Sequence, residues 1–164
     1  MPARERRRSP LPDRFMVWLL RSPLSRLVDR SVMLITVRGR HTGRMYTLPV
    51  QYAAVGDTIW VVPGDHERKT WWRNLVGETP VALLVRGGEI YGSAQVFTGR
   101  SDPAEVEQGL STYLDRFPRV ASRLGVTHEH GGIDGERLRD VVKRSVIVRI
   151  VLNTSRAGDP DPRP

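Results

Sequence analysis

Residues 39–44 read Gly39-Arg40-His41-Thr42-Gly43-Arg44, and they lie between two apolar runs at residues 32–37 and 48–55. This pattern predicts a turn that joins two strands, because glycine tolerates the positive φ angles that tight turns need. Exposed backbone N–H groups among arginine, histidine and threonine side chains are typical of a site for phosphate or carboxylate. The same residues also fit a basic turn that contacts only solvent, so both interpretations stay open at this point.

The composition favours an anionic partner. The 164 residues include 26 Lys+Arg and 18 Asp+Glu, which gives a formal net charge of +8. Such a balance is typical of proteins that bind nucleic acid, a membrane surface or a phosphorylated small molecule. The chain has no cysteine, which excludes disulfides, thiolate chemistry and cysteine-ligated metals. We expect a cytoplasmic protein without a signal peptide or membrane span, because the apolar segment at residues 15–20 is short.

One domain is expected at residues 11–153. The basic start at residues 1–10 and the polar tail at residues 154–164 are expected to be disordered, because both are rich in proline and polar residues. An amphipathic helix is predicted from Pro12 to about Arg30. It would either pack on the core or turn a basic face to a membrane or to an anionic ligand tail.

From residue 31 onward the pattern is mainly that of strands. Two hairpin turns are expected, at Gly56-Asp57 and Gly87-Gly88. Strands are predicted at residues 32–37, 46–54, 58–62, 81–85, 89–97 and 145–152. Helices are predicted at residues 69–76, 102–116 (with Asp102 as N-cap), 118–124 and 137–141. Six strands with few helices between them predict a mainly β protein with flanking helices (α+β), built as a closed or nearly closed antiparallel barrel.

The motifs resemble the deazaflavin (F420)-dependent nitroreductase and quinone-reductase family over about residues 34–97. The family pattern is Gly-Arg-Lys-(Ser/Thr)-Gly, an arginine three residues after the second glycine, then proline, and later Trp-(Tyr/Trp)-x-Asn-Leu. This chain has Gly39 to Gly43, Pro49 and Trp71-Trp72-Arg73-Asn74-Leu75. It departs from the pattern at His41, where the family has lysine, and at Tyr46, where the family has arginine.

The resemblance implies a six-stranded antiparallel split β-barrel and an oxidoreductase. Reduced coenzyme F420 would give hydride to a quinone, nitro compound or enone, and the cofactor itself would carry the chemistry. The residues implied to bind the cofactor are Arg40, His41, Thr42, Gly43 and Arg44 at the anionic tail, and Pro49, Val50 and Trp71 at the ring. No side chain is assigned a catalytic role. The acceptor would stack near Trp18 or Tyr113. Homodimer formation is implied by analogy of fold, and peripheral membrane contact through the N-terminal basic helix is a further expectation.

Two alternatives remain. The first is a split-barrel protein that binds FMN. The tail of FMN is shorter and less acidic and needs fewer cations, which suits a chain with His41 in place of lysine and Tyr46 in place of arginine. The second is a module that binds nucleic acid or another anionic surface. The net charge of +8 supports this alternative, but aromatic residues are not interleaved with the basic ones, as base stacking would require. Nucleic acid is therefore not the expected partner.

Several residues have ordinary structural explanations. His128 and His130 have His-x-His spacing, but no cysteine accompanies them, so we expect no metal site. Asp134 and Glu136 are expected to be solvated carboxylates, and Asn74 to be a hydrogen-bonding residue at a helix end. Trp71 and Trp72 are adjacent on a helix and point about 100° apart, so both cannot face one pocket.

Overall fold

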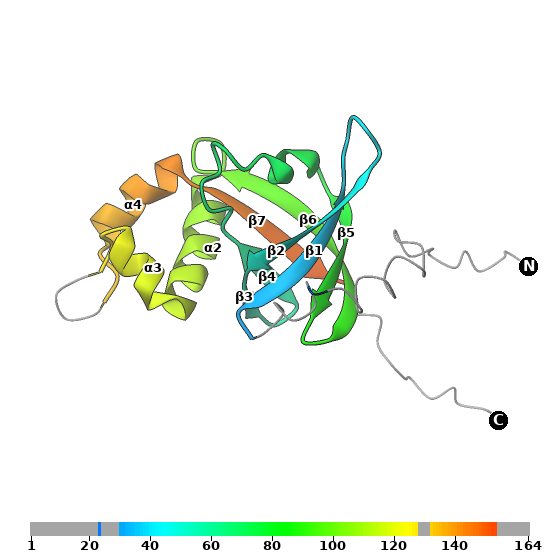
Figure 1. Cartoon of the computed structure of the whole chain (residues 1–164). Coiled ribbons are helices and arrows are strands. Elements are labelled where there is room, and N and C mark those ends of the chain that lie inside the picture. The colour runs from blue at the N-terminus through cyan, green and yellow to red at the C-terminus, as the bar shows by residue number, and fades with distance from the viewer. Residues whose placement is uncertain (1–22, 24–29, 128–131, 154–164) are drawn as a thin grey trace, which may run out of the picture.

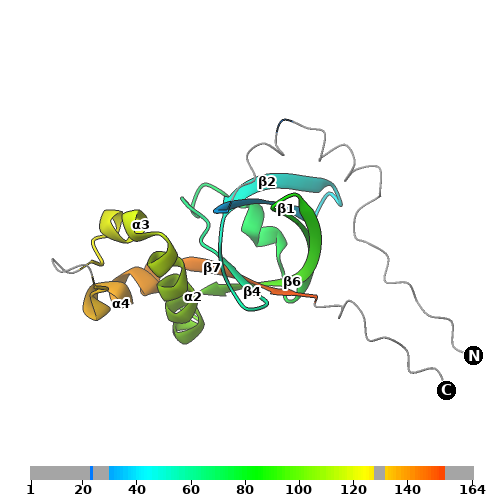
Figure 2. The ribbon, with the colours of Figure 1, turned by 90° about the horizontal axis from the view of Figure 1, so that it is seen from below.

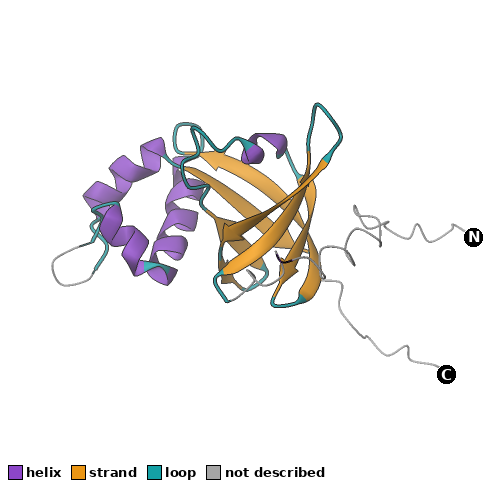
Figure 3. Ribbon diagram, in the orientation of Figure 1, coloured by secondary structure: helices purple, strands orange, loops and turns teal. Residues whose placement is uncertain are grey.

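The computed structural model describes residue 23, residues 30–127 and residues 132–153. Most of the predicted N-terminal helix, the basic start, the polar tail, His128 and His130 therefore lie outside the described residues. Within them the chain is mainly β, as predicted, with helices gathered beside the sheet (Figure 3).

Seven strands form one antiparallel sheet in the order β2-β1-β5-β6-β7-β4-β3. Their bounds are β1 (Val32–Arg38), β2 (Met45–Gln51), β3 (Ala53–Val55), β4 (Thr58–Val61), β5 (Thr79–Val85), β6 (Gly88–Thr98) and β7 (Val146–Leu152). The sheet curls into a ring, which is seen end-on in Figure 2. The two edge strands, β2 and β3, are joined end to end, because β2 ends at Gln51 and β3 begins at Ala53.

The predicted single strand at residues 46–54 is wrong, and this is why seven strands are found instead of six. Strand β2 pairs with β1, whereas β3 pairs with β4 at the other edge of the sheet. Between them, Tyr52 is buried and donates its N–H to the Ser31 carbonyl, 3.0 Å away. The chain therefore passes from one edge of the ring to the other at Tyr52.

The helices are η2 (Trp71–Asn74, a 3-10 helix), α2 (Pro103–Arg116), α3 (Pro118–Arg123) and α4 (Gly135–Arg144). Helix α2 lies against the sheet, and α3 and α4 lie on the side of α2 that faces away from the sheet (Figure 1). The short helix η2 lies at one end of the ring, near the β1–β2 turn (Figures 1 and 2).

Alternating side chains divide the sheet between two cores. Ile59 and Val61 of β4 point into the ring, where they join buried residues of β1, β5 and β7. Trp60 points outward and packs with Leu110 and the other apolar residues of α2, α3 and α4. Gly109 allows α2 to approach closely, because a Cβ there would lie 2.4 Å from the Trp60 ring. The run at residues 32–37 is buried on both faces, as predicted.

Three local predictions need correction. The β5–β6 hairpin turns at Arg86-Gly87, not Gly87-Gly88, and both residues have positive φ, 49° and 79°. Asp102 is the N-cap residue of α2, as predicted, but its side chain makes no capping hydrogen bond. Asp134, expected to be merely solvated, is the N-cap of α4.

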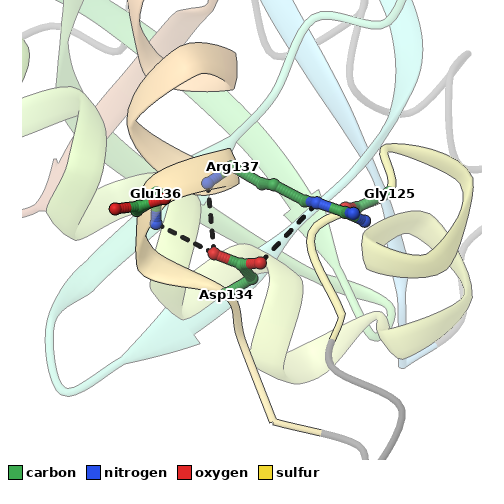
Figure 4. A network of polar contacts seen from close by, with 4 residues as sticks. All are labelled: Gly125, Asp134, Glu136 and Arg137. Atoms are coloured by element: carbon green, nitrogen blue, oxygen red, sulfur yellow. Dashed lines mark hydrogen bonds and ion pairs between the residues drawn. The ribbon is translucent and has the colours of Figure 1, made fainter.

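Figure 4 shows how Asp134 performs this role. One carboxylate oxygen accepts from the N–H groups of Glu136 and Arg137, at 3.0 and 3.3 Å. The guanidinium of Arg137 lies 3.6 Å from the other oxygen and donates to the Gly125 carbonyl at 3.1 Å. These contacts explain why α4 begins at Gly135, two residues before the predicted start.

Candidate functional site

Residues 39–44 form the turn between β1 and β2, as predicted. The Gly39 N–H donates to the Arg44 carbonyl at 2.7 Å, and the Gly43 N–H donates to the Gly39 carbonyl at 2.8 Å. Gly43 has a φ of 67°, a conformation that is costly for other residues. The two glycines thus hold the turn in one shape.

Most backbone N–H groups of the turn are already used. Arg40 donates to Asn74 Oδ1 at 3.2 Å, and Arg44 donates to Thr42 Oγ1 at 3.3 Å. Among the described residues, no acceptor is found for the N–H groups of His41 and Thr42. The expected set of open backbone donors is therefore reduced to these two.

Tyr46 shapes the turn. Its hydroxyl lies 3.3 Å from Thr42 Oγ1, and its ring is so close to Gly39 that a Cβ there would lie 2.7 Å from Cε2. The side chain is nevertheless 43% exposed. At the position where the family resemblance predicts a cation, this chain has a ring that fixes the conformation of the turn.

A first cavity, the turn cavity, has a volume of about 550 Å³. It opens between the turn, the start of β2 and helix η2. It is lined by Gly39, His41, Thr42, Tyr46, Thr47, Leu48, Thr70, Trp71 and Asn74. No carboxylate is among these residues.

A second cavity, the barrel-edge cavity, has a volume of about 230 Å³. Most of its lining residues are apolar in type, although polar and apolar atoms share its exposed surface about equally. The lining consists of Leu48, Pro49, Val50, Gln51, Val61, Val62, Pro63, Gly64, Lys69, Trp71 and Tyr113. Lys69 is the charged member of this lining. Because Leu48 and Trp71 line both cavities, the two cavities meet at these side chains.

Most of the candidate residues lie on this pair of cavities. His41 and Thr42 line the turn cavity, Pro49 and Val50 line the barrel-edge cavity, and Trp71 lines both. Arg40, Gly43 and Arg44 belong to the same turn and are exposed, but they line neither cavity.

The two tryptophans of η2 differ in their surroundings, as expected of adjacent residues. Both are half-buried against the barrel core. Trp71 lines the cavities, whereas Trp72 donates its indole N–H to the His66 carbonyl at 3.2 Å and lies under the Arg73 guanidinium, 5.3 Å from the ring centroid. Asn74 hydrogen-bonds at the helix end, as predicted, since its Nδ2 donates to the Trp71 carbonyl. It also holds the turn through Arg40.

Tyr113 is brought to the site by α2. Its hydroxyl donates to Gln51 Oε1 at 2.9 Å, and burial raises the pKa of Tyr113 to about 12. The phenol therefore stays neutral at physiological pH. Gln51 was not predicted as a site residue, and no sequence pattern links it to Tyr113, because the two are 62 residues apart.

Over the described residues, no three His, Asp or Glu side chains are grouped so that they could hold a metal ion. No helix in this part of the chain is both long and apolar enough to span a membrane. The predicted peripheral membrane contact falls on the N-terminal helix, which lies largely outside the described residues, and nothing in the described part supports it.

Comparison with known proteins identifies the family. A family model described as F420H(2)-dependent quinone reductase matches residues 21–117, which is more than half of the chain. A solved structure described as an F420-H2 dependent reductase (FDR-A) is 16% identical, with a TM-score of 0.53 over 76% of this chain and 96% of that one. No curated protein matches closely enough to count as a relative.

A second solved structure, described as a domain-swapped dimer, is also 16% identical, with a TM-score of 0.54 over 85% of this chain and 94% of that one. At this identity the two structures show the fold alone, and they confirm the predicted split barrel. The family model covers the turn, η2 and Tyr113. The chain belongs to the F420H(2)-dependent quinone reductase family.

Proposed function

We propose that this oxidoreductase binds F420H2 along the turn cavity and the barrel-edge cavity and reduces a quinone there. One observation carries the proposal: the two cavities meet at Trp71, with a cationic turn beside the first and mostly apolar residues, together with Lys69 and Gln51, around the second. When bound, the cofactor supplies a hydride, so that F420H2 and a quinone give F420 and a hydroquinone, with one proton accompanying the hydride.

The described residues fit such a cofactor. Its anionic tail needs hydrogen-bond donors and cations, and the turn offers the free N–H groups of His41 and Thr42 beside Arg40 and Arg44. Among the described residues, no carboxylate lines either cavity, so no fixed negative charge would repel the tail. Guanidinium groups can bind phosphate or carboxylate in a bidentate way, which gives orientation as well as affinity.

The residues proposed for the ring site shape the cavity and do not take part in the chemistry. Pro49, Val50 and Trp71 would line the ring site and keep water away from it. Val50 is buried and belongs to the barrel core, so its position is set by packing. Tyr113, neutral and hydrogen-bonded to Gln51, forms one polar part of the wall of the barrel-edge cavity.

The test is a titration of the purified protein with F420 and with FMN, followed by tryptophan fluorescence. We expect F420 to bind and FMN to bind weakly. Arg40→Ala and Arg44→Ala should each raise the Kd for F420 by about threefold to tenfold, because each exposed cation contributes modestly. Arg139→Gln, which alters an exposed arginine on α4 away from both cavities, is the control.

The outcomes separate the candidate functions. Tight binding of FMN in place of F420 would point to a flavoprotein. Silence with both ligands, together with salt-sensitive retention on DNA, would support a nucleic-acid module and contradict the enzyme. Oxidation of F420H2 by an acceptor restores the absorbance of F420. If a nitroarene or an enone restores it and a quinone does not, the acceptor belongs to one of those two classes.

We further propose that the protein forms a homodimer. The support is that one structure with the same fold is described as a domain-swapped dimer. Size-exclusion chromatography with light scattering should give twice the mass of the 18.6 kDa chain. A monomer at all concentrations tested would exclude this assembly.

A further inference from the structure

A third cavity lies where the end of α2 and helix α3 approach the end of β2. It has a volume of about 360 Å³. Three arginines contribute to its wall, so we name it the arginine cavity. Its lining consists of Gln51, Arg116, Phe117, Pro118, Arg119, Val120 and Arg123.

The charge around this cavity is uncompensated. Among the described residues, none of the three guanidinium groups has a hydrogen bond or an ion pair, and no carboxylate lines the cavity. Arg116 lies 5.7 Å from the centroid of the Phe117 ring, which contributes no negative charge. Three cations around one hollow repel one another, and a bound anion would relieve this repulsion.

The arginine cavity adjoins the barrel-edge cavity, because Gln51 lines both. Tyr113 fixes this junction from the other side, since its hydroxyl donates to Gln51 Oε1. The Gln51 NH2 group has no acceptor among the described residues. The Tyr113 ring also packs on Phe117, with centroids 4.8 Å apart. The same aromatic pair thus connects the proposed ring site with the arginine cavity.

We infer that the arginine cavity binds an anionic substituent of the electron acceptor, a carboxylate or sulfonate, while the acceptor's ring stacks on the cofactor's ring at the Tyr113 side of the barrel-edge cavity. This inference rests on the proposed function. The cofactor's own acidic tail has the same chemistry, but its proposed place is the turn cavity, on the other side of Trp71. Three guanidinium groups are well suited to an acid group, because each can donate two parallel hydrogen bonds.

The experiment compares two quinones of similar ring structure. Menadione is neutral, and naphthoquinone sulfonate carries one negative charge. Neither can alkylate a thiol here, because the chain has no cysteine. Binding is measured by calorimetry without cofactor, and KM and kcat are measured with F420H2. The variant is Arg116→Gln/Arg119→Gln, which changes two exposed side chains, and the control is Arg139→Gln.

We expect the double variant to raise both Kd and KM for naphthoquinone sulfonate by about tenfold, from two exposed charge-assisted contacts. Values for menadione, the Kd for F420 and all values for the control should stay unchanged. Higher ionic strength should weaken sulfonate binding to the unmodified protein and leave menadione unaffected.

Other results would overturn the inference. Equal losses for both quinones would mean that the arginines act on folding or on the ring site. A weaker Kd for F420 with unchanged sulfonate binding would assign the cavity to the cofactor's tail. If neither quinone is reduced but sulfonate binding still depends on Arg116 and Arg119, the proposed function fails and the arginine cavity stands.

Discussion

Gly109 is the residue at which local helix preference and tertiary packing conflict. Alanine is favoured over glycine within a helix by about 1 kcal/mol. However, a Cβ at this position would lie 2.4 Å from both Ile147 Cδ1 and the Trp60 ring. Overpacking of this kind costs about 1–3 kcal/mol, and both neighbours are buried in the core between the sheet and helices α2, α3 and α4. Packing therefore outweighs propensity at Gly109.

We predict that Gly109→Ala lowers the free energy of unfolding by about 1–2 kcal/mol, which is the overpacking cost less the gain in helix propensity. Urea denaturation followed by tryptophan fluorescence would measure the change. Gln108→Ala, at the exposed neighbouring position, is the control and should change stability by less than about 0.5 kcal/mol. Stabilisation by Gly109→Ala would mean that α2 can move away from Trp60 at little cost.

The pKa of Tyr113 gives a second prediction at the scale of one residue. In the unfolded chain the phenol has its ordinary pKa of 10, and in the folded protein burial raises it to about 12. Between these pH values the unfolded chain loses a proton that the folded chain keeps, so stability falls as pH rises through this window. The slope attributable to Tyr113 is roughly 1 kcal/mol per pH unit.

Tyr113→Phe removes this group. At neutral pH the variant should be less stable by about 1 kcal/mol, because the hydrogen bond to Gln51 is lost. Above pH 10 the difference between the two proteins should shrink, since only the unmodified protein carries the penalty of Tyr113. Parallel stability curves from pH 7 to pH 12 would contradict the predicted shift.

At the scale of elements, helix η2 and the β1–β2 turn act together through Asn74. Its side chain accepts from the Arg40 N–H and donates to the Trp71 carbonyl, so one residue holds both the cationic turn and the tryptophan of the proposed ring site. We predict that Asn74→Ala lowers the free energy of unfolding by about 1 kcal/mol. We also predict that it raises the Kd for F420 by about fivefold, because the turn must be ordered on binding.

Fluorescence titration and thermal unfolding of the same samples would check both effects. Glu78→Gln, an exposed change shortly after η2, is the control. A normal Kd for F420 despite the predicted loss of stability would show that the turn keeps its shape without Asn74.

The elements that the sequence predicted well are those determined by local pattern. Strand β1 is a continuous apolar run, and Pro103 begins α2 as its position predicted. The break at Tyr52 could not be predicted, because the apolar pattern continues across it and only sheet closure interrupts the strand. The turn at Arg86 was missed since a positive φ at a non-glycine residue has no sequence signal. The Asp134 cap could have been found, because an aspartate before a short amphipathic helix is a typical N-cap.

Only the part of the candidate site that belongs to local motifs could be predicted from the sequence. The turn and Trp71 belong to recognisable motifs, and the structure brings them together at one cavity. The arginine cavity depends on Gln51 of β2 meeting Arg116, Arg119 and Arg123, a contact between distant segments. No periodicity or spacing rule links residues so far apart in the sequence, so this part of the site needed the folded chain.

For the whole molecule, the net charge of +8 should influence how ligands arrive. We predict that the association rate of F420 falls about tenfold between low and high ionic strength, because screening removes long-range attraction. The rate for menadione should not change. Stopped-flow tryptophan fluorescence would measure both, and equal salt dependence for the two ligands would exclude electrostatic steering.

The passage of the chain at Tyr52 has a mechanical consequence for the molecule. Among the described residues β2 and β3 are not paired with each other, so no β-ladder closes the ring there. The covalent chain, the Tyr52 to Ser31 hydrogen bond and the packing of buried side chains hold this seam. Spreading the ring between β2 and β3 breaks no β-ladder hydrogen bond, whereas spreading it between any two paired strands breaks several. Gln51, immediately before the seam, lines both the barrel-edge cavity and the arginine cavity. We therefore expect the barrel to yield more easily at this seam, beside the two cavities, than between strands that are paired.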